Sequence, residues 1–173
     1  MLKDYTKEFE DILKDILENE TVLKMQNFNQ HYSTSCYEHS KNVAYYSYLM
    51  AKKWNLDYVS ATRAGMLHDL FLYDWRIPSK EHKKLHAFRH PRIAYNNAKE
   101  IFNLNEKEKD SILKHMWPLT IVPPICKEAY VVTLADKYCT YLENRKYIKE
   151  NRKFQKMYRY AYVFLSMVVI RFV

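Results

Sequence analysis

A single glycine, Gly65, stands among the 173 residues of this chain, together with five prolines. Glycine normally makes up about 7% of a protein. A β-sheet needs many tight turns, and those turns rely on glycine, asparagine and proline for their backbone conformations. A chain this poor in glycine is unsuited to a strand-rich fold, so we predict an all-α protein.

Apolar residues recur at helical spacing along the chain, which predicts a bundle of about seven helices. Asp57 and Asn105 are expected to act as N-caps, and His90-Pro91 should open a helix because proline is tolerated in the first turn. The helices are expected at about residues 6–25, 36–54, 57–68, 90–102, 105–115, 124–147 and 152–173. No internal repeat or flexible linker interrupts this pattern, so we expect one domain over residues 1–173.

Three features bear on where the protein works. Its three cysteines are odd in number and show no CxxC spacing, which favours a reducing compartment. The first twenty residues are charged throughout and lack the apolar core of a signal peptide. The apolar run Tyr160–Ile170 is shorter than the roughly 20 residues that span a bilayer. We expect a cytoplasmic protein without a transmembrane segment. The apolar run is expected to form a buried final helix, with a membrane-surface or subunit contact as the alternative.

The charge of the chain suggests an anionic partner. Its formal net charge is +8 and its pI is near 9.2. Net charge bears on partners and solubility rather than on fold. Two interpretations remain open, a phosphorylated or nucleic-acid partner and a merely solubilising excess of lysine.

Two aspartates lie in segments that should be buried. His68-Asp69 ends the apolar segment AGMLHDLFL, and Asp136 lies inside AYVVTLADKYCTYL. A carboxylate buried in such surroundings costs several kcal/mol unless a cation or strong hydrogen-bond donors compensate it. Imidazole and carboxylate groups together suit Fe, Mn, Zn and similar divalent ions. The pattern therefore predicts a metal site.

The segments YEHSKNVA, MLHDLF, FRHPRIA, LKHMWP and LADKY follow one another in the order His, His-Asp, His, His, Asp. Over about residues 32–147 this order resembles the HD-domain metal-dependent phosphohydrolase superfamily. The resemblance implies one HD domain with two divalent metal ions, Fe or Mn being favoured and Zn, Mg, Ni or Co remaining open. His68 and Asp69 are expected to be the catalytic pair. The implied metal ligands are His39, His68, Asp69, His90, His115 and Asp136.

We expect these ligands to form two overlapping sets. The first metal would be held by His39, His68, Asp69 and Asp136. His90 and His115 match the additional histidines of two-metal members and would hold the second metal, with Asp69 bridging the two ions.

The resemblance implies hydrolysis of a phosphate ester or anhydride by a metal-activated hydroxide, and a nucleotide is the expected substrate. The spacing is loosely similar to that of bacterial nucleotide-hydrolysing members, including diadenosine tetraphosphate hydrolases. Two alternatives stay open. One is a di-iron oxygenase of the same superfamily, of which myo-inositol oxygenase is an example, and the other is a non-catalytic module that binds nucleotide or RNA. A second copy of the chain, giving a homodimer, is a further candidate partner.

Basic and aromatic residues near the expected metal ligands are candidates for binding substrate. Guanidinium and ammonium groups would contact phosphate, although a solvated basic loop explains them nearly as well. Trp75 and Trp117 are candidates for stacking on a base, although core packing is the more usual role of tryptophan. Gly65 is expected to allow close helix packing around the metals. The predicted substrate-binding residues are Arg76, His86, Arg89 and Lys137.

Overall fold

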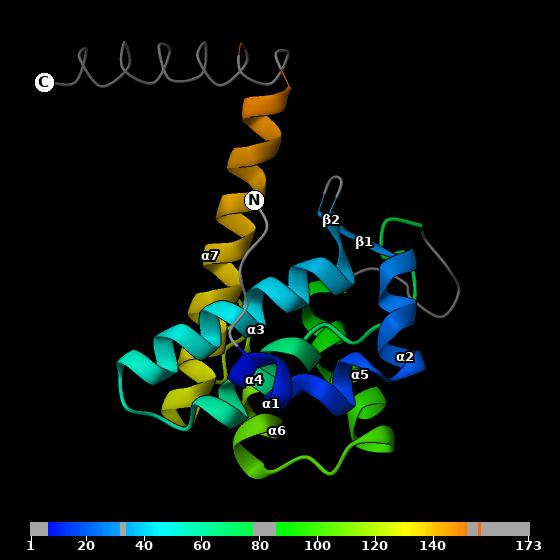
Figure 1. The fold of residues 1–173 in the computed structure, drawn as a ribbon. Coiled ribbons are helices and arrows are strands. Elements are labelled where there is room, and N and C mark those ends of the chain that lie inside the picture. Colours follow the sequence, from blue (N-terminus) through cyan, green and yellow to red (C-terminus); the bar gives the residue numbers. More distant parts are fainter. Residues whose placement is uncertain (1–6, 32–33, 78–85, 152–155, 157–173) are drawn as a thin grey trace, which may run out of the picture.

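The computed structural model describes residues 7–31, 34–77, 86–151 and 156, and the helical prediction is confirmed within them. Figure 1 shows a bundle of helices with one short pair of strands at its edge. The elements are α1 (Lys7–Leu17), α2 (Glu20–Leu23), the 3₁₀ turn η1 (Lys24–Asn27), β1 (Asn29–His31), β2 (Thr34–Ser35), α3 (Cys36–Lys53), α4 (Tyr58–Leu67), α5 (His86–Ile101), α6 (Glu106–Lys114) and α7 (Lys127–Glu150).

The packing of α3 against α4 forms the centre of the bundle. A Cβ atom added to Gly65 of α4 would lie 2.8 Å from the Cα and 3.0 Å from the nitrogen of Ala44 in α3. Only a residue without a side chain fits between these backbones, which confirms the predicted role of Gly65. Buried apolar residues of α1, such as Phe9 and Leu13, cover this pair of helices and extend the core.

Side-chain caps fix where the helices begin. Ser35 and Glu38 form a capping box at the start of α3, and Asn105 and Glu108 form a second one at the start of α6. Asp57 accepts a hydrogen bond from the backbone of Ser60 at the start of α4, as predicted. The three helices therefore start within two residues of the positions that the sequence predicts.

The helix expected over residues 6–25 is wrong as a single element, because the chain is interrupted after α1 and starts again as α2. Asn19 adopts an extended backbone, and its side chain accepts from the backbone nitrogens of Thr21 and Val22. An N-cap of this kind starts a new helix and turns the chain. The small antiparallel pair β1–β2, which the sequence analysis did not predict, follows η1.

The start expected for the helix at His90-Pro91 is also wrong. Helix α5 is described from His86, and Pro91 lies inside it rather than in its first turn. Proline lacks the N–H that would bond the carbonyl of the residue four before it. Helix α5 therefore lacks one backbone hydrogen bond at Pro91, the residue directly after the predicted ligand His90. Helix α7 likewise starts at Lys127, three residues after the predicted position, with Cys126 as its N-cap.

Helix α7 crosses α3 and also contacts α4 and α6, and its C-terminal part extends beyond the rest of the bundle (Figure 1). None of the helices that the structure describes is long and apolar enough to cross a membrane. The final helix expected over residues 152–173, with its apolar run Tyr160–Ile170, lies outside the described residues, apart from position 156.

Candidate metal centre

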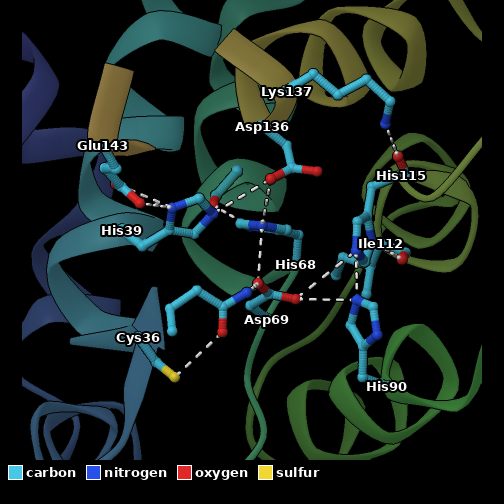
Figure 2. A network of polar contacts seen from close by, with 12 residues as sticks. Cys36, His39, His68, Asp69, His90, Ile112, His115, Asp136, Lys137 and Glu143 are labelled. Atoms are coloured by element: carbon cyan, nitrogen blue, oxygen red, sulfur yellow. Dashed lines mark hydrogen bonds and ion pairs between the residues drawn. The ribbon is translucent and has the colours of Figure 1, made fainter. Parts of the chain in front are cut away.

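The six predicted ligands converge on one place from five segments of the bundle (Figure 2). His39 lies in the first turn of α3, and His68 is the C-cap of α4 with Asp69 directly after it. The other three come from α5, from the C-cap of α6 and from the middle of α7. All four histidines and Asp69 are at most 4% exposed. Residues separated by nearly 100 positions thus form one buried polar cluster.

Three of the histidines are held in the same way. The Nδ1 atoms of His68 and His115 lie 2.8 and 2.9 Å from the carbonyl oxygens of Gly65 and Ile112, and that of His90 lies 2.9 Å from the carbonyl of His86. A carbonyl only accepts, so each Nδ1 must carry the hydrogen. The last carbonyls of a helix have no partner within it, and the rings of His68 and His115 satisfy two of them.

This tautomer leaves the Nε2 atoms of the same three rings directed into the cluster. The Nε2 atoms of His90 and His115 lie only 2.8 Å apart. Two neutral rings with hydrogen on Nδ1 would bring two lone pairs together there, which is unfavourable unless a cation lies between or beside them. The Nε2 of His68 is buried and has no hydrogen-bond partner among the described residues. All three nitrogens are therefore presented as electron-pair donors.

Asp69 lies between the two halves of the cluster. Its Oδ2 is 3.4 Å from the Nε2 of His68, whereas its Oδ1 is 3.2 Å from the Nε2 of His90 and 3.7 Å from that of His115. Gln30 of β1 donates from its side-chain amide to Oδ2, and Oδ1 has no hydrogen-bond partner among the described residues. The two carboxylate oxygens thus face opposite sides of the site.

His39 is held between two carboxylates, both from α7. Its Nε2 lies 3.2 Å from Oδ1 of Asp136, and its Nδ1 lies 3.1 Å from both oxygens of Glu143. Figure 2 shows Glu143 on the side of the ring away from Asp69. The Oδ1 of Asp136 is also 3.9 Å from the Nε2 of His68, so this carboxylate links the two rings.

The two halves of the cluster differ in how their histidines titrate. Burial works against protonation of His39, but the hydrogen bonds of Asp136 and Glu143 prevail and raise its pKa to about 10. Burial has the opposite effect on His115 and lowers its pKa to about 3. One half of the site therefore attracts positive charge, while the other half keeps a neutral imidazole with a free lone pair.

These donors fit a divalent metal. Three trios of ligand atoms lie within 4.8 Å of one another. Imidazole nitrogens and carboxylate oxygens are the ligands that Fe, Mn and Zn use in proteins. A metal ion would explain the orphaned Nε2 of His68 and Oδ1 of Asp69, and it would relieve the contact between two imidazole nitrogens. The trios are His39–His68–Asp69, His68–His115–Asp136 and Asp69–His90–His115.

Four of the six clustered ligands line a cavity of about 700 Å³. The polar part of the lining contains Asp69, His90, His115, Asp136 and the ammonium group of Lys137. The rest of the lining is largely apolar and aromatic and includes Trp75, Ala87, Met116, Pro118 and Leu119.

Two of the four predicted substrate-binding residues line this cavity, and the other two do not. His86 and Lys137 line it, and the Nζ of Lys137 donates to the carbonyl of His115 at 3.2 Å. Arg76 is exposed and its guanidinium is engaged by Asp74 at 2.8 and 2.9 Å, and Arg89 is also exposed. Neither arginine is among the residues that line the cavity. His86 reaches it because it lies one helical turn before His90, on the same face of α5.

An aromatic stack connects the apolar wall to the metal ligands. The ring of Trp75 stacks on that of His86, with centroids 5.4 Å apart and planes 16° apart, and His86 stacks on His90 at 4.6 Å and 20°. The other tryptophan of interest, Trp117, lines a neighbouring apolar cavity and contacts Tyr130 edge-on. The described residues do not include part of the basic segment between Arg76 and Arg92, namely Lys80, His82, Lys83 and Lys84.

The sequence analysis missed two residues of this centre, Gln30 and Glu143. Glu143 follows Asp136 by seven residues, and two helical turns place both on one face of α7. That spacing was a signal in the sequence. Gln30 had none, because it lies on the short strand β1, which the chain pattern did not predict.

Comparison with protein-family models agrees with the arrangement of the centre. The model of the HD domain matches residues 36–141, which is more than half of the chain and includes all six clustered ligands. The searches of curated proteins and of solved structures returned no match. The match spans more than half of the chain, and the chain belongs to the HD domain family.

Proposed function

We propose that this protein hydrolyses a phosphate ester or anhydride of a nucleotide, with two divalent metal ions held by the six clustered ligands. The observation that carries the proposal is the convergence of imidazole and carboxylate donors at a cavity, where the Nε2 of His68 and the Oδ1 of Asp69 have no hydrogen-bond partner among the described residues. HD domains are in general metal-dependent hydrolases, which supports the same chemistry.

The charges of the site favour a pair of ions over a single one. Asp69, Asp136 and Glu143 are three largely buried carboxylates, with side chains 2, 13 and 10% exposed. Their negative charge needs compensation in these surroundings. Asp69 directs one oxygen to each half of the centre, as a bridging carboxylate would. His39, His68 and Asp136 would complete one metal position, and His90 and His115 the other. Bound there, the ions would act as Lewis acids on the phosphate and make water available as hydroxide at neutral pH.

The residues of the cavity suit a substrate with an anionic end and a planar apolar end. Lys137 presents an ammonium group beside the metal ligands, where it would contact a phosphate oxygen. Burial lowers the pKa of Lys137 from its ordinary value. Trp75, supported from behind by the ring of His86, offers an aromatic face on which a nucleobase would stack. The predicted binding of substrate by Arg76 and Arg89 has less support, since neither residue lines the cavity.

The experiment is an activity screen on the full chain purified without chelator and loaded with Mn²⁺ or, without air, with Fe²⁺. The substrates are p-nitrophenyl phosphate, bis-p-nitrophenyl phosphate, nucleoside mono-, di- and triphosphates, and dinucleoside polyphosphates. We expect metal-dependent cleavage of a phosphate bond that is lost in Asp69→Ala. Iron-dependent consumption of oxygen without phosphate cleavage would support the oxygenase instead. Binding of nucleotide or RNA without any turnover would support a non-catalytic module.

A further inference from the structure

We propose that Glu143 makes the two metal positions unequal, so that the position of His39 binds its ion more tightly than the position of His90 and His115. The inference rests on the proposed two-metal function. It assigns Glu143 as a positioning residue that acts on the metal through His39 and does not itself contact the ion.

His39 differs from the other three histidines of the cluster in the hydrogen-bond partner of its Nδ1 atom. The Nδ1 atoms of His68, His90 and His115 donate to neutral backbone carbonyls. The Nδ1 of His39 instead faces the carboxylate of Glu143, at 3.1 Å from both oxygens. An ionised acceptor makes a stronger hydrogen bond than a carbonyl does. It also fixes the ring orientation and increases the basicity of the nitrogen that binds the metal.

The charges around each position differ in the same direction. The His39 position has Asp136, one oxygen of Asp69 and, behind the ring, Glu143. Among the described residues, the carboxylate oxygens near His90 and His115 are Oδ1 of Asp69, at 3.2 and 3.7 Å, and an oxygen of Asp136 within 4.8 Å of a His115 nitrogen, so this side has no counterpart of Glu143. The ammonium group of Lys137, which donates to the carbonyl of His115, adds positive charge on that side. A divalent cation is therefore attracted more strongly to the His39 position.

The geometry also restricts what else Glu143 can do. Its side chain is 10% exposed, and its carboxylate lies behind the ring of His39, on the side away from Asp69 (Figure 2). It is not among the residues that line the cavity. Contact with substrate is therefore excluded by its position, and its effect must pass through the imidazole.

The test is a calorimetric titration of the metal-free full chain with Mn²⁺. The wild type should show two classes of sites of different affinity. Glu143→Gln keeps the size of the side chain but removes its charge, and it should weaken the tighter class by roughly 10- to 100-fold while changing the weaker class little. Glu143→Asp, which restores the charge at a shorter reach, should recover part of the loss. Glu150→Gln is the matched control, because it removes the same charge from the exposed last turn of the same helix.

Equal weakening of both classes, or no change in either, would overturn the proposal. A general structural role would lower the melting temperature of the metal-free chain by the same amount in Glu143→Gln and Glu143→Asp, with no recovery of affinity in the latter, and would also overturn it. Titration of His90→Gln provides a second readout, because it should remove the weaker class and leave the tighter one. Since no substrate is used, these results are independent of phosphate hydrolysis. Two unequal sites without phosphate cleavage would leave this inference standing and reject the proposed function.

Discussion

The replacement of Gly65 by alanine tests whether close contact of α3 and α4 holds the metal centre together. The added methyl group would meet Ala44 at 2.8 Å from its Cα and 3.0 Å from its nitrogen, and it would lie 3.1 Å from the hydroxyl of Ser47. Two of these three neighbours are backbone atoms, which cannot rotate away as a side chain does. The helices must therefore separate by a few tenths of an ångström.

Two effects of opposite sign set the magnitude. Overpacking of a tight core costs about 1–3 kcal/mol. Alanine is preferred over glycine inside a helix by about 1 kcal/mol. Because the closest contacts of the new group are with backbone, we place the overpacking cost in the upper part of its range. The net loss of stability is then about 1–2 kcal/mol, which lowers the melting temperature of a chain of this size by roughly 2–8 °C.

Thermal unfolding of metal-free Gly65→Ala measures this loss, and a Mn²⁺ titration measures its effect on the centre. We expect weaker metal binding as well, since the carbonyl of Gly65 accepts from His68, whose ring centroid lies 5.5 Å from that of His39. The double variant Gly65→Ala/Ser47→Ala should recover only a small part of the lost stability, because it removes the hydroxyl of Ser47, which is one of the three close neighbours of the added methyl group. A Gly65→Ala variant as stable as the wild type, with unchanged metal affinity, would refute the reasoning.

Three further predictions address the site and the fold. Asp69→Asn should weaken the binding of both metals in a Mn²⁺ titration, because the carboxylate faces both halves of the centre; loss of one class alone would contradict its bridging role. Trp75→Ala should lower kcat/KM for a nucleotide by roughly 5- to 150-fold, from a stacking energy of about 1–3 kcal/mol, and leave p-nitrophenyl phosphate unaffected; an equal loss for both substrates would exclude stacking. Burial works against ionisation of Asp110, yet Lys114 and the backbone of Cys126 lower its pKa. A lowered pKa stabilises the fold above the unfolded value of about 3.9 and loses this effect as the pH falls through the folded value. The stability difference between wild type and Asp110→Asn in urea unfolding should therefore be constant above about pH 5 and shrink below pH 4, and a difference independent of pH would contradict this ion pair.

The sequence was informative where a local signal marks an element or a ligand. Scarcity of glycine predicted the helical class, and the capping residues Asp57 and Asn105 predicted two helix starts. The HD pair in an apolar helix predicted a buried carboxylate, and Asp69 is 2% exposed. For the caps and the buried carboxylate the physical cause lies within a few residues of the signal, and the scarcity of glycine acts along the whole chain.

The remaining features depend on contacts between distant segments. Gln30 donates to Asp69 across 39 positions, and Glu143 faces His39 across 104. The Gln30 pairing leaves no mark in the local pattern of the chain, and the spacing of Asp136 and Glu143 places both on one face of a helix without indicating that Glu143 faces His39. The proline inside α5 misled the prediction, because the helix continues across Pro91 although proline lacks the backbone N–H of a regular helical hydrogen bond.

The central claim is that six side chains from five segments hold two metal ions. The most direct measurement is the anomalous scattering of crystals of the full chain grown with Mn²⁺. We predict two peaks about 3.5–4 Å apart, one on each side of Asp69. One peak should lie beside the Nε2 of His39 and the other beside the Nε2 atoms of His90 and His115. A single peak at saturating Mn²⁺, with the rings of His90 and His115 turned away from it, would contradict the account.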